Sequence, residues 1–242
     1  MSIINKASVW SLLLLAGAAL VLSACGGSGS SVTGGESVTA SQFAKLAAGN
    51  KWVTETATTN TSKIGNNTPT TTTTNETNTT VLGAVAASGV QVTRTSVNTT
   101  TNTNRPTSIN FVKLDAAGNL IDKDKDIILP ASMAVGTTWT IVLDGISATL
   151  KVTGVNTSQT VAGLGTFNDV LVVSVTISGS LGGVLTDIMA TDYYSRAVGS
   201  VVPIQSTSTV SSSGSQTDNG VTTTVKFTGK STSVLKPGYI AN

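Results

Sequence analysis

The chain has 242 residues, of which 11% are charged, and its formal net charge is +2. It contains 42 Thr, 29 Ser, a single Cys and no His. Without His the chain lacks the commonest general base and metal ligand. A single thiol excludes an internal disulfide and a structural zinc site built from several thiolates. The small net charge, with no block of Lys or Arg, argues against nucleic acid as a partner.

Residues 1–24 have the pattern of an export signal. Lys6 supplies the positive charge near the amino terminus, residues 7–22 form an apolar run, and small residues precede Cys25. The run has about 16 residues, fewer than the roughly 20 that a membrane-spanning helix needs. The pattern therefore predicts a secretory signal peptide over residues 1–24.

The end of the apolar run, Leu22-Ser-Ala-Cys25, resembles the bacterial lipobox. The resemblance implies that Cys25 carries a diacylglycerol thioether, with palmitate-type acylation, and becomes the first residue after cleavage. We expect it to anchor the protein to the membrane, because buried acyl chains contribute about 0.8 kcal/mol per CH2. Gly26 follows where an Asp would signal inner-membrane retention in enteric bacteria, so the outer membrane is favoured. An ordinary signal peptide with a chance cysteine is the alternative.

Residues 25–36 are rich in Gly and Ser, the composition of a flexible tether. Residues 37–242 have the size of one β-rich domain, a sandwich or a barrel. Its one helix candidate covers residues 39–48, with Thr39 or Ser41 as the cap and Gly49-Asn50 as the end.

The rest of the chain has the pattern of antiparallel strands. Apolar residues alternate with hydroxyl residues over 171–178 and again over 221–228, a period typical of half-buried strands. The dipeptides at 144–145, 182–183 and 219–220 suit tight hairpins. About ten to twelve strands exceed what a flat sheet usually holds. We therefore predict an all-β fold, one curved antiparallel sheet forming a half-barrel or incompletely closed barrel, with the short helix at its edge or mouth.

The segment over residues 68–80 leaves two alternatives open. It contains five consecutive threonines from Thr70. Threonine is a good strand former, so the segment suits a long hairpin with a ladder of Thr side chains on an edge. A solvated loop fits the same composition.

The segment Asp122-Lys-Asp-Lys-Asp126 has alternate aspartates like those that begin a calcium loop. Ile127 and Met133 stand where the EF-hand pattern requires Gly and Glu. We therefore expect a solvated, charged hairpin arm here and no metal site.

Tyr193, Tyr194 and Arg196 belong to the one cluster of aromatic and charged residues. Neighbours in a strand point to opposite faces, so we expect one tyrosine to pack inward and the other to face solvent or a groove. These three residues are the candidate ligand-binding residues, with a structural role as the alternative. Trp52 and Trp139 are expected to be core anchors.

Three segments resemble uncharacterised bacterial lipoproteins: Leu129-Pro130 before Gly136-Thr-Thr-Trp139, then Gly165-Thr-Phe-Asn-Asp-Val170, then Tyr193-Tyr-Ser-Arg-Ala-Val-Gly-Ser-Val201. The similarity covers about residues 105–205. Those proteins resemble in turn the half-barrel carriers and sensors of the bacterial envelope, in which a curved antiparallel sheet wraps a helix or a ligand. The resemblance implies this architecture and brings no catalytic residues with it.

The residues that could support catalysis form no recognisable set. A nucleophilic Ser would need Lys or a carboxylate as its base, and nothing singles out the pair of carboxylates that a glycosidase uses. We therefore expect no enzymatic activity and no cofactor. The expected function is that of a lipid-anchored envelope protein that binds an apolar ligand or a protein partner near the membrane. A structural or adhesive surface lipoprotein, favoured by the many hydroxyl residues, is the alternative.

Overall fold

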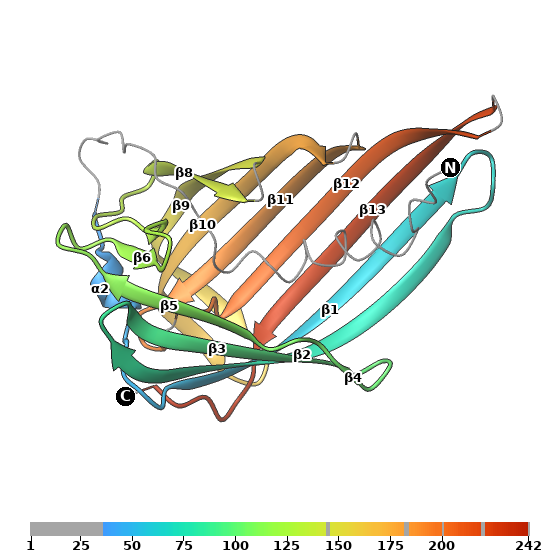
Figure 1. Ribbon diagram of the computed structural model, residues 1–242. Coiled ribbons are helices and arrows are strands. Elements are labelled where there is room, and N and C mark those ends of the chain that lie inside the picture. Colours follow the sequence, from blue (N-terminus) through green and yellow to red (C-terminus); the bar gives the residue numbers. More distant parts are fainter. Residues whose placement is uncertain (1–35, 144–145, 182–183, 200, 219–220, 242) are drawn as a thin grey trace.

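The computed structural model describes residues 36–143, 146–181, 184–199, 201–218 and 221–241. The signal peptide, Cys25 and the three hairpin dipeptides predicted at 144–145, 182–183 and 219–220 lie outside the described residues. Within them the chain forms one short helix, α2 (Ala40–Phe43), and a single antiparallel sheet of 13 strands (Figure 1). This helix is too short to cross a membrane. The predicted all-β class is confirmed.

The strands follow one another along the chain with these bounds: β1 (Lys51–Ile64), β2 (Thr70–Ala86), β3 (Gly89–Asn98), β4 (Thr103–Asn104), β5 (Ser108–Leu114), β6 (Leu120–Asp122), β7 (Ile127–Leu129), β8 (Thr138–Leu143), β9 (Ile146–Val161), β10 (Gly165–Leu181), β11 (Val184–Ser195), β12 (Gln205–Asp218) and β13 (Val221–Leu235).

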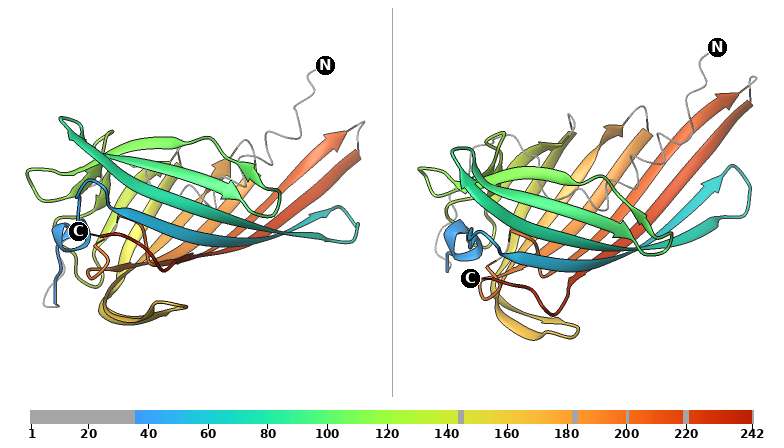
Figure 2. Two further views of the ribbon diagram at one scale, coloured as in Figure 1. Left: turned by 90° about the horizontal axis from the view of Figure 1, so that it is seen from below. Right: turned by 60° about the horizontal axis from the view of Figure 1, so that its bottom comes forward.

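The sheet is a meander whose ends meet. Its order is β7-β6-β5-β3-β2-β1-β13-β12-β11-β10-β9-β8, with β4 paired to β3. The first strand therefore pairs with the last, and the two edge strands, β7 and β8, are consecutive in sequence. The sheet curls into a nearly closed barrel, seen from two further directions in Figure 2. The predicted curved, incompletely closed barrel is confirmed.

A side-chain hydrogen bond joins the two edge strands at the seam. The indole N–H of Trp139 on β8 donates to the carbonyl oxygen of Ile127 on β7 at 3.1 Å. Trp139 is also buried, as is Trp52 at the start of β1, so both expected core anchors are confirmed.

The helix is shorter than predicted: it ends at Phe43 and does not continue to residue 48. The backbone turns away at Ala44, and the N–H of Lys45 donates to the carbonyl oxygen of Gly199 at 3.0 Å instead of to the helix. Ala40 and Phe43 are fully buried in the core. The helix thus lies at one end of the barrel (Figure 1), where its apolar residues complete the core.

The expected strand alternation is confirmed where it was clearest. Leu171, Val173, Val175 and Ile177 of β10 are buried on the inner face. The hydroxyl residues between them lie on the outer face. The period of two in the sequence therefore separates the core from the solvent in this strand.

The Thr-rich segment is a strand. Residues 70–86 form β2, but its pairing with β3 begins at Glu76, so residues 70–75 lie on an edge of the sheet. Thr59 and Thr61 of β1 form hydrogen bonds with Thr73 and Thr71 of β2, at 3.4 and 3.0 Å between hydroxyl oxygens. The hairpin with an edge ladder of threonines is confirmed, and the loop alternative is wrong.

The prediction of a solvated charged arm over residues 122–126 is wrong in part, because the side chains of Asp122 and Asp126 are buried. Asp122 Oδ1 accepts the backbone N–H groups of Asp124 and Asp126 at 2.9 and 3.0 Å. A buried turn leaves backbone donors that need an acceptor, and the carboxylate supplies it. The segment is the turn between β6 and β7. Among the described residues, no group of three His, Cys, Asp or Glu is placed to hold a metal ion.

Candidate binding site

The inner face of the barrel has two chemically different sectors. The strands β8 to β11 present mainly buried apolar side chains to the interior, namely Trp139, Ile141, Ala148, Leu150, Val152, Leu171, Val173, Val175, Ile177, Ile188 and Ala190. The strands β1, β2, β3, β12 and β13 present hydroxyl, amide and charged side chains over much of their length. We call these the apolar sector and the polar sector.

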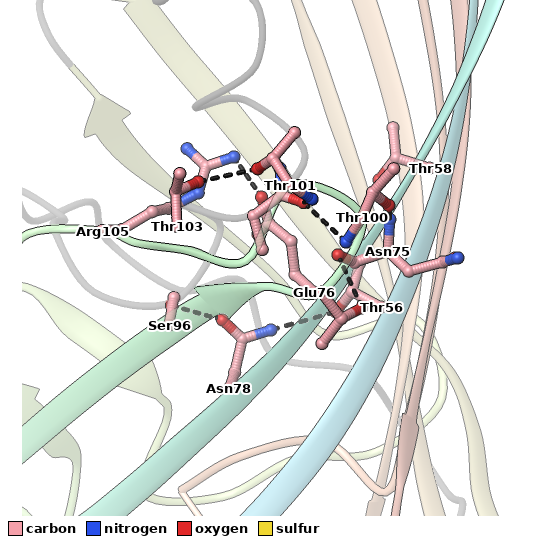
Figure 3. A network of polar contacts seen from close by, with 12 residues as sticks. Thr56, Thr58, Asn75, Glu76, Asn78, Ser96, Thr100, Thr101, Thr103 and Arg105 are labelled. Carbon is pink, nitrogen blue, oxygen red and sulfur yellow. Dashed lines mark hydrogen bonds and ion pairs between the residues drawn. The ribbon is translucent and has the colours of Figure 1, made fainter.

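A chain of hydrogen bonds crosses four strands of the polar sector (Figure 3). Thr56 Oγ1 of β1 donates to Ser233 Oγ of β13 at 3.0 Å. Asn78 Nδ2 of β2 donates to Thr56 Oγ1 at 3.2 Å, and Ser96 Oγ of β3 donates to Asn78 Oδ1. These bonds satisfy polar groups that burial would otherwise make costly. The polar lining is therefore a stable part of the fold.

An ion pair lies beside this chain. Arg105, just after β4, donates from Nη2 to Oε1 of Glu76, whose side chain is only 7% exposed. Arg94 of β3 belongs to the same cluster: burial lowers the pKa of its guanidinium, while the charge of Glu76 raises it and that of Arg105 lowers it. Two guanidinium groups thus share the field of one carboxylate.

The turn between β3 and β4 positions Arg105 over Glu76. Asn98 Oδ1 accepts the N–H groups of Thr100 and Thr101 at 2.9 and 3.0 Å. The backbone N–H of Arg105 donates to the carbonyl oxygen of Ser96 at 2.9 Å. The arginine is therefore held by backbone as well as by side-chain contacts, and its position is fixed by the turn.

A second buried acid lies on β11. The Asp192 side chain points inward, and burial raises its pKa from 3.8 to about 6, an effect that a hydrogen bond from Ser206 of β12 opposes. The pKa of the neighbouring inward residue Tyr194 is raised, first by burial and then by the charge of Asp192. Burial therefore brings the pKa of the Asp192 carboxyl closer to neutral pH.

The structure places the two predicted tyrosines on opposite faces, as expected. Tyr194 is buried on the inner face, whereas Tyr193 is half-buried on the outer face. Arg196 lies beyond the end of β11 and donates from Nη2 to Oδ1 of Asn156. Tyr193, Tyr194 and Arg196 do not lie on the strands that carry the Glu76–Arg105 ion pair. Their role as ligand-binding residues stays a prediction.

Two of the segments that resemble lipoproteins contact each other. Asp169 Oδ1 accepts the hydroxyl of Ser195 at 2.8 Å, and its Oδ2 accepts the N–H of Ala197 at 2.6 Å. The carboxylate thus secures the turn that follows β11. These bonds give Asp169 a structural role in holding the end of the β10–β11 pair.

The residues that form the charged cluster were not identified from the sequence. Glu76, Arg94 and Arg105 are isolated charges in a Thr-rich region, with no motif around them. Strand pairing brings them together, because Arg94 lies opposite Thr80, two inward positions from Glu76 on β2. The alternation of side chains along the strand could have identified Glu76. It stands at an inward position, where a charged residue is unusual.

Comparison of the sequence with protein-family models and with curated proteins gives no match.

Proposed function

We propose that the protein is a lipid-anchored, non-enzymatic binding protein of the cell envelope, with an outer-membrane location favoured, and that its ligand is an apolar molecule held inside the barrel. The lipobox-like segment ending at Cys25 supports the anchor. The absence of His and of a recognisable catalytic set in the sequence supports a binding role.

The observation that carries the binding proposal is the partial exposure of inward side chains. Thr58, Asn60 and Ser62 of β1 point to the inner face but are only half-buried, and so are Arg94 and Ser96 of β3. Solvent therefore reaches the inner face of the polar sector. We propose that the ligand lies between this face and the apolar sector, because burial of an apolar surface is favourable.

The outer face offers a second candidate function. The ladder of Thr59, Thr61, Thr71 and Thr73 presents hydroxyls in register on neighbouring strands at the outer surface. Such a surface suits a structural or adhesive role without a small-molecule ligand. If the ligand binds inside the barrel, inward substitutions should weaken binding. If the outer surface carries the function, inward substitutions that leave the fold intact should have no effect.

The test uses a chain that starts at Gly26, which keeps every strand of the sheet, and a neutral dye, N-phenyl-1-naphthylamine. We expect saturable fluorescence enhancement. The substitution Ile188→Ser, at a buried inward position, should weaken the enhancement. The matched control Met189→Ser, at an outward position that is 63% exposed on the same strand, should leave it unchanged. Circular dichroism establishes that each variant is folded.

Absence of saturable enhancement in the folded parent protein would contradict the binding proposal and favour the structural role. Equal loss in the two variants would place the dye on the outer surface, which also contradicts it.

A further inference from the structure

Residues 70–74 of β2 form an open edge of the sheet. They pair with β1 on one side, whereas the pairing of β2 with β3 begins only at Glu76. In Figures 1 and 2 the end of the β1–β2 hairpin projects beyond β3 and β4. The edge of β8 differs, because it lies at the seam and is joined to β7 through Trp139. The end of β2 is therefore a free edge, the kind of surface to which another strand can add.

The free backbone groups of this edge belong to two residues. Asn75 accepts the N–H of Thr99 at 2.8 Å and donates its own N–H to the hydroxyl of Thr100 at 2.9 Å, so its backbone groups point away from β1. The direction of these groups alternates along a strand, so those of Thr71 and Thr73 point away from β1 as well. No strand of the described residues pairs with β2 on that side of Thr71 and Thr73. Each of the two residues therefore offers one N–H and one C=O group.

The two ends of this edge are closed. Pro69 has no N–H, so it cannot donate to a neighbouring strand. At the other end the backbone groups of Asn75 are already bonded to the turn after β3. Natural edge strands are commonly protected by charged side chains, by proline or by a bulge. Residues 70–74 are five threonines in unshifted register with β1, so the segment between the two ends carries none of these protections.

A second copy of the same edge matches the free groups. If two copies of β2 run antiparallel with Thr72 opposite Thr72, then Thr71 of each copy lies opposite Thr73 of the other. Each such pair exchanges two N–H···O=C bonds, so all the free groups of both copies are used. With Thr71 opposite Thr71, Thr73 would face Pro69, which lacks a donor. With Thr73 opposite Thr73, Thr71 would face Asn75, whose groups are engaged. The register centred on Thr72 therefore fits best.

We propose that the protein associates through this edge with a second copy of itself, in a twofold arrangement centred on Thr72. This association goes beyond the proposed binding function and does not depend on it. The pairing joins the two sheets, and the ladder of threonines on β1 and β2 continues across the junction. Threonine suits such a junction, because β-branched side chains and hydroxyl pairs stabilise cross-strand neighbours. The edge is much shorter than a standard interface, so we expect the pair to form at high protein concentration.

The experiment traps the pair with a disulfide, in a chain that starts at Gly26 and has no other thiol. Thr72→Cys places two thiols opposite each other at a non-hydrogen-bonded position, where the Cα atoms lie about 4.5 Å apart, within the range of a disulfide. The matched control is Thr59→Cys, which is exposed on β1 and would lie at least about 14 Å from its copy, three strand spacings away. On non-reducing gels after mild oxidation, we expect Thr72→Cys to form the dimer at least about tenfold faster than the control.

Further variants assign the dimer to the edge. Thr73→Pro removes an N–H that the single copy does not use, so it should leave the fold intact and lower the crosslinking rate of Thr72→Cys to that of the control. Thr73→Lys is a second test that keeps the backbone donor, because a charge on an edge opposes strand addition. Its matched control is Thr59→Lys, which loses the same hydroxyl contact between Thr59 and Thr73 but lies one strand inside the edge. Circular dichroism establishes that each variant is folded.

The register is tested by mixing Thr71→Cys with Thr73→Cys, which should crosslink to each other faster than either crosslinks to itself. Self-crosslinking that is as fast would overturn the arrangement centred on Thr72, and with it the proposal. Equal rates for Thr72→Cys and Thr59→Cys would also overturn the proposal. So would an unchanged rate in the folded Thr73→Pro variant, or equal losses in Thr73→Lys and Thr59→Lys.

Discussion

Replacement of Asp192 by Asn should stabilise the protein at neutral and alkaline pH. The acid is buried on the inner face of β11, and burial raises its pKa from 3.8 to about 6. The Asp192 carboxyl therefore holds its proton more tightly in the folded state than in the unfolded state. The stabilising effect of that proton is fully present below pH 3.8 and is lost as the pH rises through 6. Above that pH the wild type carries a buried charge that the amide variant lacks.

The magnitude follows from the two pKa values. A rise from 3.8 to about 6 corresponds to about 3 kcal/mol of lost stability once the group is fully ionised. At pH 4 the same relation leaves a difference of about 0.5 kcal/mol. The advantage of Asp192→Asn over the wild type should therefore grow by about 2.5 kcal/mol between pH 4 and pH 8. A change in the hydrogen bond with Ser206 adds an offset, which the comparison between pH values largely removes.

The assay is equilibrium urea unfolding of both proteins at several pH values between 4 and 8. Asp187→Asn is the matched control for loss of one negative charge, because Asp187 lies on the same strand with its side chain exposed. A stability difference between Asp192→Asn and the wild type that stays constant with pH, or shrinks as the pH rises, would refute the reasoning about the buried carboxyl.

Three further predictions concern the anchor and the packing. Cys25→Ser should abolish incorporation of labelled palmitate without unfolding the domain; continued labelling would contradict the lipobox assignment. Gly229→Ala should destabilise the protein by about 1–3 kcal/mol, because the added Cβ would meet side-chain atoms of both neighbouring strands at 2.7 Å; Lys230→Ala, at the adjacent outward position, should have little effect in the same urea assay. Trp139→Phe should cost about 1 kcal/mol more than Trp52→Phe. The first loses the indole hydrogen bond across the seam, whereas the indole N–H of the second has no partner among the described residues; equal losses would show that the bond does not stabilise the seam.

The alternation of residue types predicted the strands because it reports a local property. In β10 each inward residue from Leu171 to Ile177 is apolar and each neighbour is more exposed, so a period of two identifies the face without knowledge of the partners. The large number of strands then required a curved sheet. The pairing of β1 with β13, which closes this side of the sheet, was not predicted from the sequence.

Two of the features that the sequence did not predict depend on distant contacts, and one depends on a local turn. The helix ends early because Lys45 bonds to Gly199, which is far away in the chain. The expected solvated arm is partly buried because Asp122 serves the backbone of its own turn. The ion pair of Glu76 with Arg105 forms because the turn after β3 folds back against β2. The first and third of these contacts join residues that are far apart in the chain, and a single sequence does not specify such contacts.

The central claim, that a ligand binds inside the barrel, can be tested with single cysteines. A chain that begins at Gly26 has no other thiol. Thr58→Cys places a thiol on the inner face at a half-buried position, and Thr59→Cys places one on the exposed outer face of the same strand. We predict that saturating N-phenyl-1-naphthylamine slows maleimide labelling of Thr58→Cys and leaves labelling of Thr59→Cys unchanged. Equal labelling rates of Thr58→Cys with and without a ligand shown to be bound would contradict the claim.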